Sequence, residues 1–138
     1  MREILFRGKR VDNGEWVEGY YYKAKYYRTD KELCDYITIP YPDEENRGSD
    51  HFIVIPETVG QYTGLTDKNG KKIFEGDVVK GKDCLEYDLE VFGYIDHKNG
   101  SFVIVGDFMT HYRWLDYDLE VIGNIHDNPE LLKGENDA

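Results

Sequence analysis

Three Asn-Gly dipeptides constrain this chain more than any other feature, because each marks a tight turn between two extended segments. They are Asn13-Gly14, Asn69-Gly70 and Asn99-Gly100, and each lies between runs that contain β-branched or aromatic residues. Asn and Gly both tolerate the positive φ angles of two-residue turns, so the pattern is the strongest short-range signal for a β-hairpin. The chain is therefore expected to be mainly β, with antiparallel strands.

The strand pairs follow from the runs on either side of each turn. The expected pairs are residues 3–11 with 15–22, residues 59–65 with 71–79, and residues 89–95 with 102–105. Helical signals are few. A capping-box spacing at residues 29–32 precedes residues 33–37, and Asn128-Pro129 offers an N-cap followed by proline. We expect one or two very short helices at these two places.

The length of the chain favours a single hydrophobic core. At 138 residues the chain is expected to form a single compact unit over 1–138, because a core of this size needs no disulfide or metal. Four regions are predicted within it: an N-terminal β-hairpin region over 1–28, a variable loop with room for a short helix over 29–50, a β-rich core over 51–127, and a turn of helix with a tail over 128–138.

The charge is strongly acidic and unevenly distributed. The formal net charge of −11 opposes a phosphate backbone, so tight binding of nucleic acid is not expected. Residues 1–30 carry seven Lys/Arg against five Asp/Glu, whereas residues 31–138 carry ten against twenty-three. Any basic surface is therefore confined to the N-terminal end. No apolar run approaches the roughly 18–20 residues of a membrane-spanning helix, so a cytoplasmic protein without membrane contact is expected.

Two segments resemble each other at an offset of thirty residues. Residues 85–95 and 115–125 share Leu, Tyr, Leu, Val and Ile at every second position, with acids at alternate sites. This alternation is typical of a strand with one core face and one solvated face. Similar packing demands on two strands explain it, and a paired acidic binding surface is the functional alternative.

The motifs of common catalytic and metal sites are missing. Asp67-Lys68-Asn69-Gly70 resembles part of a calcium loop, but Leu65 and Gly76 would occupy its first and twelfth positions. One arrangement that folding could bring together for a metal is Asp96-His97 with His126-Asp127. No nucleophile elbow or phosphate-binding glycine loop is present. We therefore predict no catalytic, cofactor-binding or metal-binding residues, and a non-enzymatic role.

The N-terminal segment over residues 19–28 alternates aromatic rings with cations. The candidate residues are Tyr20, Tyr22, Lys23, Lys25, Tyr26 and Arg28. Rings and cations together can stack bases and neutralise phosphates of a single strand. Tyrosine is also enriched where protein subunits meet. A third interpretation is an amphipathic strand whose inward tyrosines cover the core.

Five blocks of sequence, in this order, carry a resemblance to a known family. They are residues 2–9 (REILFRGK), 14–20 (GEWVEGY), 58–72 (TVGQYTGLTDKNGKK), 73–79 (IFEGDVV) and 120–132 (EVIGNIHDNPELL). With these blocks the chain resembles the YopX family, whose members are encoded by bacteriophages and prophages. The segment over 73–79 is similar to the entry of a strand in an SH3-like barrel.

The resemblance implies an SH3-like β barrel over 51–127 with an additional N-terminal β-hairpin. It also implies a phage or prophage origin, residence in the cytoplasm of a host bacterial cell, and a homo-oligomer, with a ring as one form. It supplies no catalytic residue. Within the matching blocks, Gln61, Thr63 and Asp67 cluster in one hairpin and are candidates for an interaction surface. Hydrogen bonding at the turn and the strand ends explains them equally well.

The sequence thus favours an accessory protein that acts through protein contacts, including self-association and contact with a host or phage protein. One alternative is a single-stranded nucleic-acid binder that uses the N-terminal Tyr/Lys segment. Another is an acidic DNA mimic that inhibits a host DNA-binding protein, for which carboxylates would have to follow one another along a ridge.

The first prediction concerns the far-ultraviolet circular dichroism spectrum of the chain. We expect strand to dominate it, with helix well below the roughly one-third that is average for globular proteins. A mainly helical spectrum would contradict the turn-based reasoning.

Overall fold

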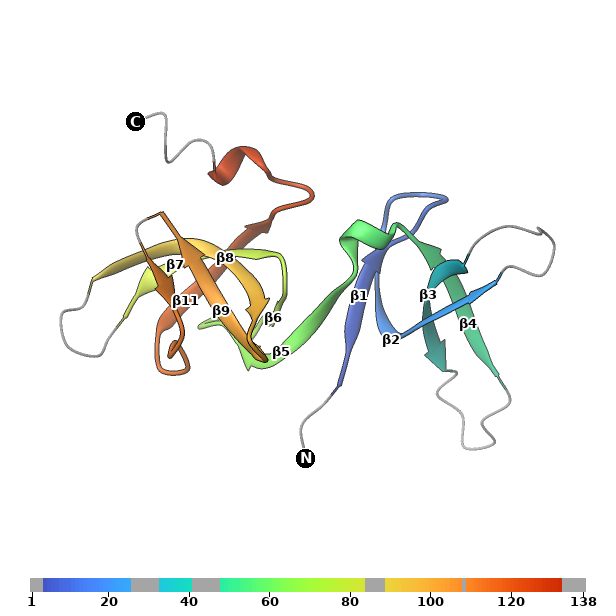
Figure 1. Cartoon of the computed structure of the whole chain (residues 1–138), viewed down its shortest axis with the longest axis horizontal. Coiled ribbons are helices and arrows are strands. Elements are labelled where there is room, and N and C mark those ends of the chain that lie inside the picture. The colour runs from blue at the N-terminus through green and yellow to red at the C-terminus, as the bar shows by residue number, and fades with distance from the viewer. Residues whose placement is uncertain (1–3, 26–32, 41–47, 84–88, 108, 133–138) are drawn as a thin grey trace. The chain divides into compact units, whose positions relative to one another are not determined.

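The computed structural model describes residues 4–25, 33–40, 48–83, 89–107 and 109–132. The chain forms two compact units, Met1–Gln61 and Tyr62–Ala138 (Figure 1). Strands make up 63% of the described part, which confirms the mainly β prediction. No helix in this part is long and apolar enough to cross a membrane. The single compact unit expected over 1–138 stays a prediction.

The N-terminal unit is an antiparallel sheet. Its strands are β1 (Phe6–Lys9), β2 (Trp16–Lys25), β3 (Leu33–Pro40) and β4 (Ser49–Val54), in the order β4-β3-β2-β1. The first predicted hairpin is found with a shorter ladder than expected, since β1 pairs with β2 only from Phe6 opposite Gly19 to Lys9 opposite Trp16. Gly14 in the turn has φ 72°, a conformation that costs glycine little.

The end of β4 returns to the end of β1. Arg10 and Val54 form a bridge, and the Val11 N–H donates to the Ile53 carbonyl at 2.9 Å. The 3₁₀ turn η1 (Pro56–Thr58) follows, where Thr58 Oγ1 accepts the Lys9 N–H at 2.9 Å. One side of this sheet, called the inner face here, buries Ile37 and Val54 almost completely.

The helix expected over residues 33–37 is wrong, because these residues belong to β3. Strand β3 pairs with β2 on one side and with β4 on the other, and Ile37 therefore lies between Tyr21 and Phe52. β-Branched and aromatic side chains suit such a paired, half-buried position. The capping-box residues 29–32 lie outside the described residues. Much of the loop predicted over 29–50 is thus strand.

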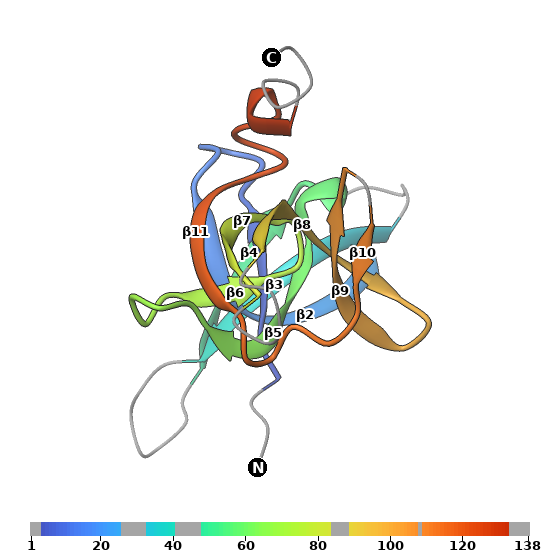
Figure 2. The same cartoon turned by 90° about the vertical axis from the view of Figure 1, so that its left-hand side faces the viewer.

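The C-terminal unit contains the larger part of β5 and all later elements. The strands are β5 (Gly60–Thr66), β6 (Lys72–Phe74), β7 (Asp77–Lys82), β8 (Glu90–Lys98), β9 (Ser101–Gly106), β10 (Thr110–His111) and β11 (Asp118–Asn124). Five of them form a sheet in the order β10-β9-β8-β7-β11 (Figure 2). Residues 130–132 form the short helix predicted after Asn128-Pro129.

Two of the expected hairpins are found here, one of them shortened. Strands β8 and β9 pair up to Lys98 opposite Ser101, and Asn99 and Gly100 between them both have positive φ. In the other hairpin β5 pairs with β6, which ends at Phe74. A turn with positive φ at Gly76 then sends the chain into β7 and the five-stranded sheet. The pairing predicted up to residue 79 was therefore too long.

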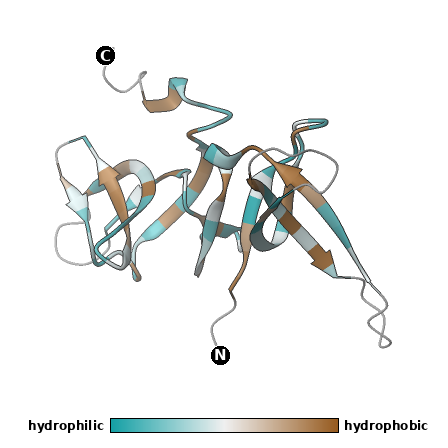
Figure 3. Ribbon diagram, turned by 45° about the vertical axis from the view of Figure 1, so that its right-hand side comes forward, coloured by the Kyte–Doolittle hydropathy of each residue, from teal (hydrophilic) through white to brown (hydrophobic). Residues whose placement is uncertain are grey.

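The internal similarity has a structural cause. Strands β8 and β11 flank β7 on opposite sides, and Val79 of β7 faces Gly93 on one side and Val121 on the other. Val91 and Ile95 of β8 and Leu119 of β11 are therefore buried in the same core, whereas Leu89 and Leu115 of the two similar segments are exposed. Figure 3 shows apolar (brown) and polar (teal) residues following one another along the strands. The core comprises Ile73, Val79, Val91, Ile95, Ile104, Trp114 and Leu119. Among the described residues no closed barrel is detected, so the SH3-like barrel stays a prediction.

Asp67 ties the β5–β6 turn to β11. Its Oδ1 accepts the N–H groups of Asn69 at 2.8 Å and Lys71 at 2.9 Å, and its Oδ2 accepts that of Val121 at 3.0 Å. Burial alone would raise the pKa of Asp67. The three N–H donors outweigh burial and hold this pKa below its usual value.

Replacing Asp67 tests this clamp. We expect Asp67→Ala to lower the free energy of unfolding by about 2–4 kcal/mol, because buried N–H groups lose a charged acceptor. The depressed pKa also means that this contribution is present above the unfolded-state pKa of about 4 and is lost as the pH falls. Urea unfolding at pH 7 and pH 3 measures both effects. The exposed Asp116→Ala is the control, and equal stability of the two variants would contradict the clamp.

Candidate interaction surface

The outer face of the N-terminal sheet, opposite Ile37 and Val54, carries two cross-strand rows. Tyr20 lies opposite Thr38, which lies opposite His51. Tyr22 lies opposite Tyr36 in the neighbouring row. We call these five residues the tyrosine face. Tyr20 is 57% exposed and Tyr22 is 37% exposed, whereas Tyr36 is buried beneath them.

Four of the five side chains of this face, those of Tyr22, Tyr36, Thr38 and His51, are held in place by one another. The rings of Tyr22 and Tyr36 stack with centroids 5.0 Å apart and an interplanar angle of 9°. His51 Nδ1 lies 2.9 Å from the hydroxyls of both Tyr22 and Thr38, and its Nε2 lies 3.1 Å from Ser49 Oγ. Each hydroxyl can donate or accept, so the cluster suits either tautomer of the imidazole. The exposed edge of Tyr22 is therefore ordered before any partner arrives.

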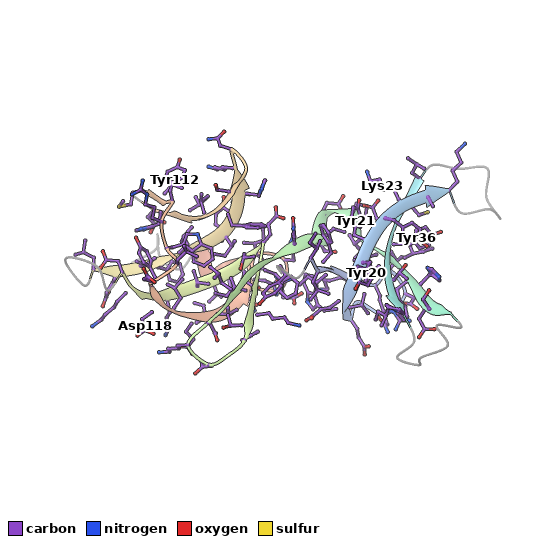
Figure 4. The ribbon with its side chains drawn as sticks, turned by 90° about the horizontal axis from the view of Figure 1, so that it is seen from below. Tyr20, Tyr21, Lys23, Tyr36, Tyr112 and Asp118 are labelled. Atoms are coloured by element: carbon purple, nitrogen blue, oxygen red, sulfur yellow. The ribbon has the colours of Figure 1, made fainter. Side chains whose placement is uncertain are left out.

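The candidate lysines lie on the other side of the sheet. Lys23 is opposite Asp35 and Lys25 is opposite Leu33, in the register that alternates with Tyr20 and Tyr22. Figure 4 shows Tyr20, Tyr21 and Lys23 along β2, with Tyr36 on the neighbouring β3. Successive side chains of a strand point to opposite faces. The alternation of rings and cations therefore separates them instead of combining them. Tyr26 and Arg28 lie outside the described residues.

Tyr21 belongs to the same side as these lysines. Its hydroxyl donates to Asp35 Oδ2 at 2.6 Å, and its ring contacts that of Phe6 with centroids 5.5 Å apart. Burial, followed by the hydrogen bond and the negative charge of Asp35, raises the pKa of Tyr21 to about 12. Tyr21 is thus an anchor of the sheet, and Asp35, only 6% exposed, depends on it for a hydroxyl partner.

The hairpin candidates have internal roles. Thr63 is 8% exposed and donates to the Ile73 carbonyl at 2.8 Å, and Asp67 is 7% exposed within its three hydrogen bonds. Gln61 is half-buried and pairs with Phe6 of β1. Gln61 ends the N-terminal unit, and Thr63 and Asp67 belong to the C-terminal unit. Thr63 and Asp67 are therefore engaged in hydrogen bonds inside their own unit.

Sequence reasoning missed three of the five residues of the tyrosine face. Tyr36 and Thr38 fall in the region predicted as a variable loop, and His51 is not among the candidates that the sequence supplied. The signal that could have found them is the run Tyr36-Ile37-Thr38-Ile39, whose β-branched members favour a strand.

A groove of about 650 Å³ lies on the C-terminal unit, over β7 and its neighbours. Lys82 of β7 lies between Glu90 of β8 and Asp118 of β11, and Lys80 lies opposite Glu120. The acids of the two similar strands are therefore interleaved with lysines. This arrangement neutralises charge locally and does not form a continuous acidic ridge.

The remaining titratable groups offer no metal site within the described residues, where no group of three or more His, Cys, Asp or Glu could hold a metal ion. His111 Nδ1 lies 3.2 Å from the Tyr117 hydroxyl. Burial lowers the pKa of His111, and the charge of Asp83 opposes this effect. His111 is therefore a half-buried histidine at the edge of the five-stranded sheet.

Two comparisons with known proteins find relatives. The family model described as YopX protein matches residues 5–133. The crystal structure of protein EF1440 from Enterococcus faecalis has a TM-score of 0.52 and 26% sequence identity, and the match covers 96% of this chain and 99% of that one. No curated protein matches the chain.

The Tyr21–Asp35 pair predicts a late-titrating tyrosine. Phenolate absorbance should show one group with a pKa near 12 that is missing in Tyr21→Phe. A raised pKa stabilises the fold below the unfolded-state value of about 10, and this contribution is lost as the pH rises through the folded value. At pH 7 the variant should lose about 1–3 kcal/mol of unfolding free energy, because Asp35 loses its donor. Identical titration curves for the two proteins would contradict the pair.

Proposed function

Since this chain belongs to the YopX family, we propose that it is a non-enzymatic phage or prophage accessory protein that acts through protein contacts in the host cytoplasm. Self-association is the first of these contacts, and a host or phage protein is the second partner. The observation that supports the proposal is the tyrosine face, where the ring of Tyr22 is fixed by its neighbours and Tyr20 lies exposed on the same paired sheet.

Tyrosine suits protein contacts for physical reasons. It supplies a large, flat contact area while freezing few side-chain torsions, and it is enriched at interfaces. Tyr22 has already lost its freedom, because it stacks on Tyr36 and its hydroxyl meets His51. Ordering side chains on binding typically costs about 0.5–1.5 kcal/mol each, and a preorganised ring avoids much of that cost.

The two alternatives have less support. A single-strand binder needs cations beside its stacking rings, and the pleat of β2 places Lys23 and Lys25 on the face opposite Tyr20 and Tyr22. A DNA mimic needs consecutive carboxylates, and the lysines of β7 interrupt those of β8 and β11. Protein contact therefore ranks first.

We also propose that the C-terminal unit is built on an SH3-like barrel plan. Backbone bonds join its hairpin to the five-stranded sheet: the Lys68 N–H donates to the Leu119 carbonyl at 2.9 Å, and the Gly76 N–H donates to the Ile95 carbonyl at 2.8 Å. These bonds join the turns before and after β6 to β11 and β8 of the sheet, and a barrel requires such links between the hairpin and the sheet.

Light scattering over a concentration series tests self-association. We expect the mass to rise with concentration, and a plateau at a higher stoichiometry would favour a ring. Tyr20→Ser should weaken association about tenfold, equivalent to about 1.4 kcal/mol. Tyr112→Ser, which removes a similarly exposed tyrosine of the C-terminal unit, should leave association unchanged.

A monomer at every concentration would overturn the proposal. Raising the ionic strength should strengthen association, because salt screens the repulsion between two chains of net charge −11. Tight binding of labelled single-stranded DNA at moderate salt, lost in Tyr20→Ser, would instead promote the nucleic-acid alternative.

A further inference from the structure

Half of strand β2 is paired on one side only. Strand β1 covers β2 from Trp16 to Gly19, whereas residues 20–25 pair with β3 alone among the strands of the described residues. An open edge presents unpaired backbone N–H and C=O groups, which are a template for another strand.

We propose that two copies of this chain pair antiparallel through the β2 edge, about a two-fold axis at Tyr22. This proposal rests on the self-association proposed above. The occupant is a second copy because the edge complements itself. Residues that face each other in an antiparallel pair lie on the same face of the sheet, so a symmetric pair must be centred on one residue. An axis at Tyr22 places Tyr22 opposite its own copy, Tyr21 opposite Lys23, and Tyr20 opposite Ala24.

Neighbouring registers are worse for identifiable reasons. An axis at Lys23 places two lysines directly opposite, and an axis at Ala24 places Lys23 opposite Lys25, so like charges meet in both. An axis at Tyr21 extends the pairing to Gly19, whose edge already pairs with Phe6 of β1. The Tyr22 axis gives the longest pairing, residues 20–24, without either conflict.

Lys23 and Lys25 favour the register centred on Tyr22 and do not prevent pairing at the β2 edge. Lysine on an edge strand commonly discourages pairing between chains. In the Tyr22 register, however, Lys23 faces an aromatic ring of the partner and lies beside Asp35 of its own sheet. On the outer face, the paired Tyr22 rings continue the stack that each makes with its own Tyr36. The result is one sheet that runs through both copies.

Disulfide trapping tests the register. In a Cys34→Ser, Cys84→Ser background, Tyr22→Cys should form a covalent dimer at least ten times faster than Lys23→Cys under mild oxidation. Directly opposite Cβ atoms lie about 4.5–5.5 Å apart, close to what a disulfide needs, whereas two Lys23 positions would be offset along the strands. The double variant Tyr20→Cys, Ala24→Cys should also form dimers, which provides a second test if loss of Tyr22 disturbs the fold.

The outcomes separate the two proposals. Association by light scattering with equal or reversed trapping rates would overturn the β2 register and leave self-association standing. Trapping only when another protein supplies the strand would also overturn it, in favour of a different partner at this edge. A background protein that stays monomeric and shows no rapid trapping at residue 22 would overturn both.

Discussion

The two-residue period of the β-strand is the constraint on which the surfaces of both units depend. Along β2 it sends Tyr20 and Tyr22 to one face and Lys23 to the other, so the described residues 20–25 present rings without cations on the outer face. Along β7 the same period buries Val79 and leaves Lys80 outside, where it meets Glu120 of β11. The linear order of residue types is therefore a poor guide to function until the faces are assigned.

Features encoded locally could be predicted from the sequence. The Asn-Gly turns identify hairpins because the required φ angles belong to two adjacent residues, and Asn99 with Gly100 adopts them. Strand β3 could not be recognised in this way. Strand β3 is stabilised by β2 and β4 on either side, and these contacts are not visible in the local sequence. The capping-box spacing before Leu33 therefore predicted a helix, although residues 33–40 are extended.

The candidate surface could likewise be predicted only in part. Tyr20 and Tyr22 were identified because rings are conspicuous in sequence. Their partners were missed, since Tyr36 and His51 reach Tyr22 only through pairing across β3 and β4. Thr63 shows the opposite difficulty. A polar side chain near a turn suits a surface or an internal hydrogen bond equally, and only the fold reveals that it donates to Ile73.

The position of β7 between β8 and β11 has a consequence for folding during synthesis. Strand β8 joins β7 across a short connection, whose ends meet where the Asp83 N–H donates to the Leu89 carbonyl at 3.0 Å. Strand β11 arrives only after β8, β9 and β10 have been made, so its contact order is higher. A nascent chain that stops before β11 has an open, valine-rich edge on β7. Strand β11, which is made after the other strands of this sheet, therefore covers an edge that would otherwise favour aggregation.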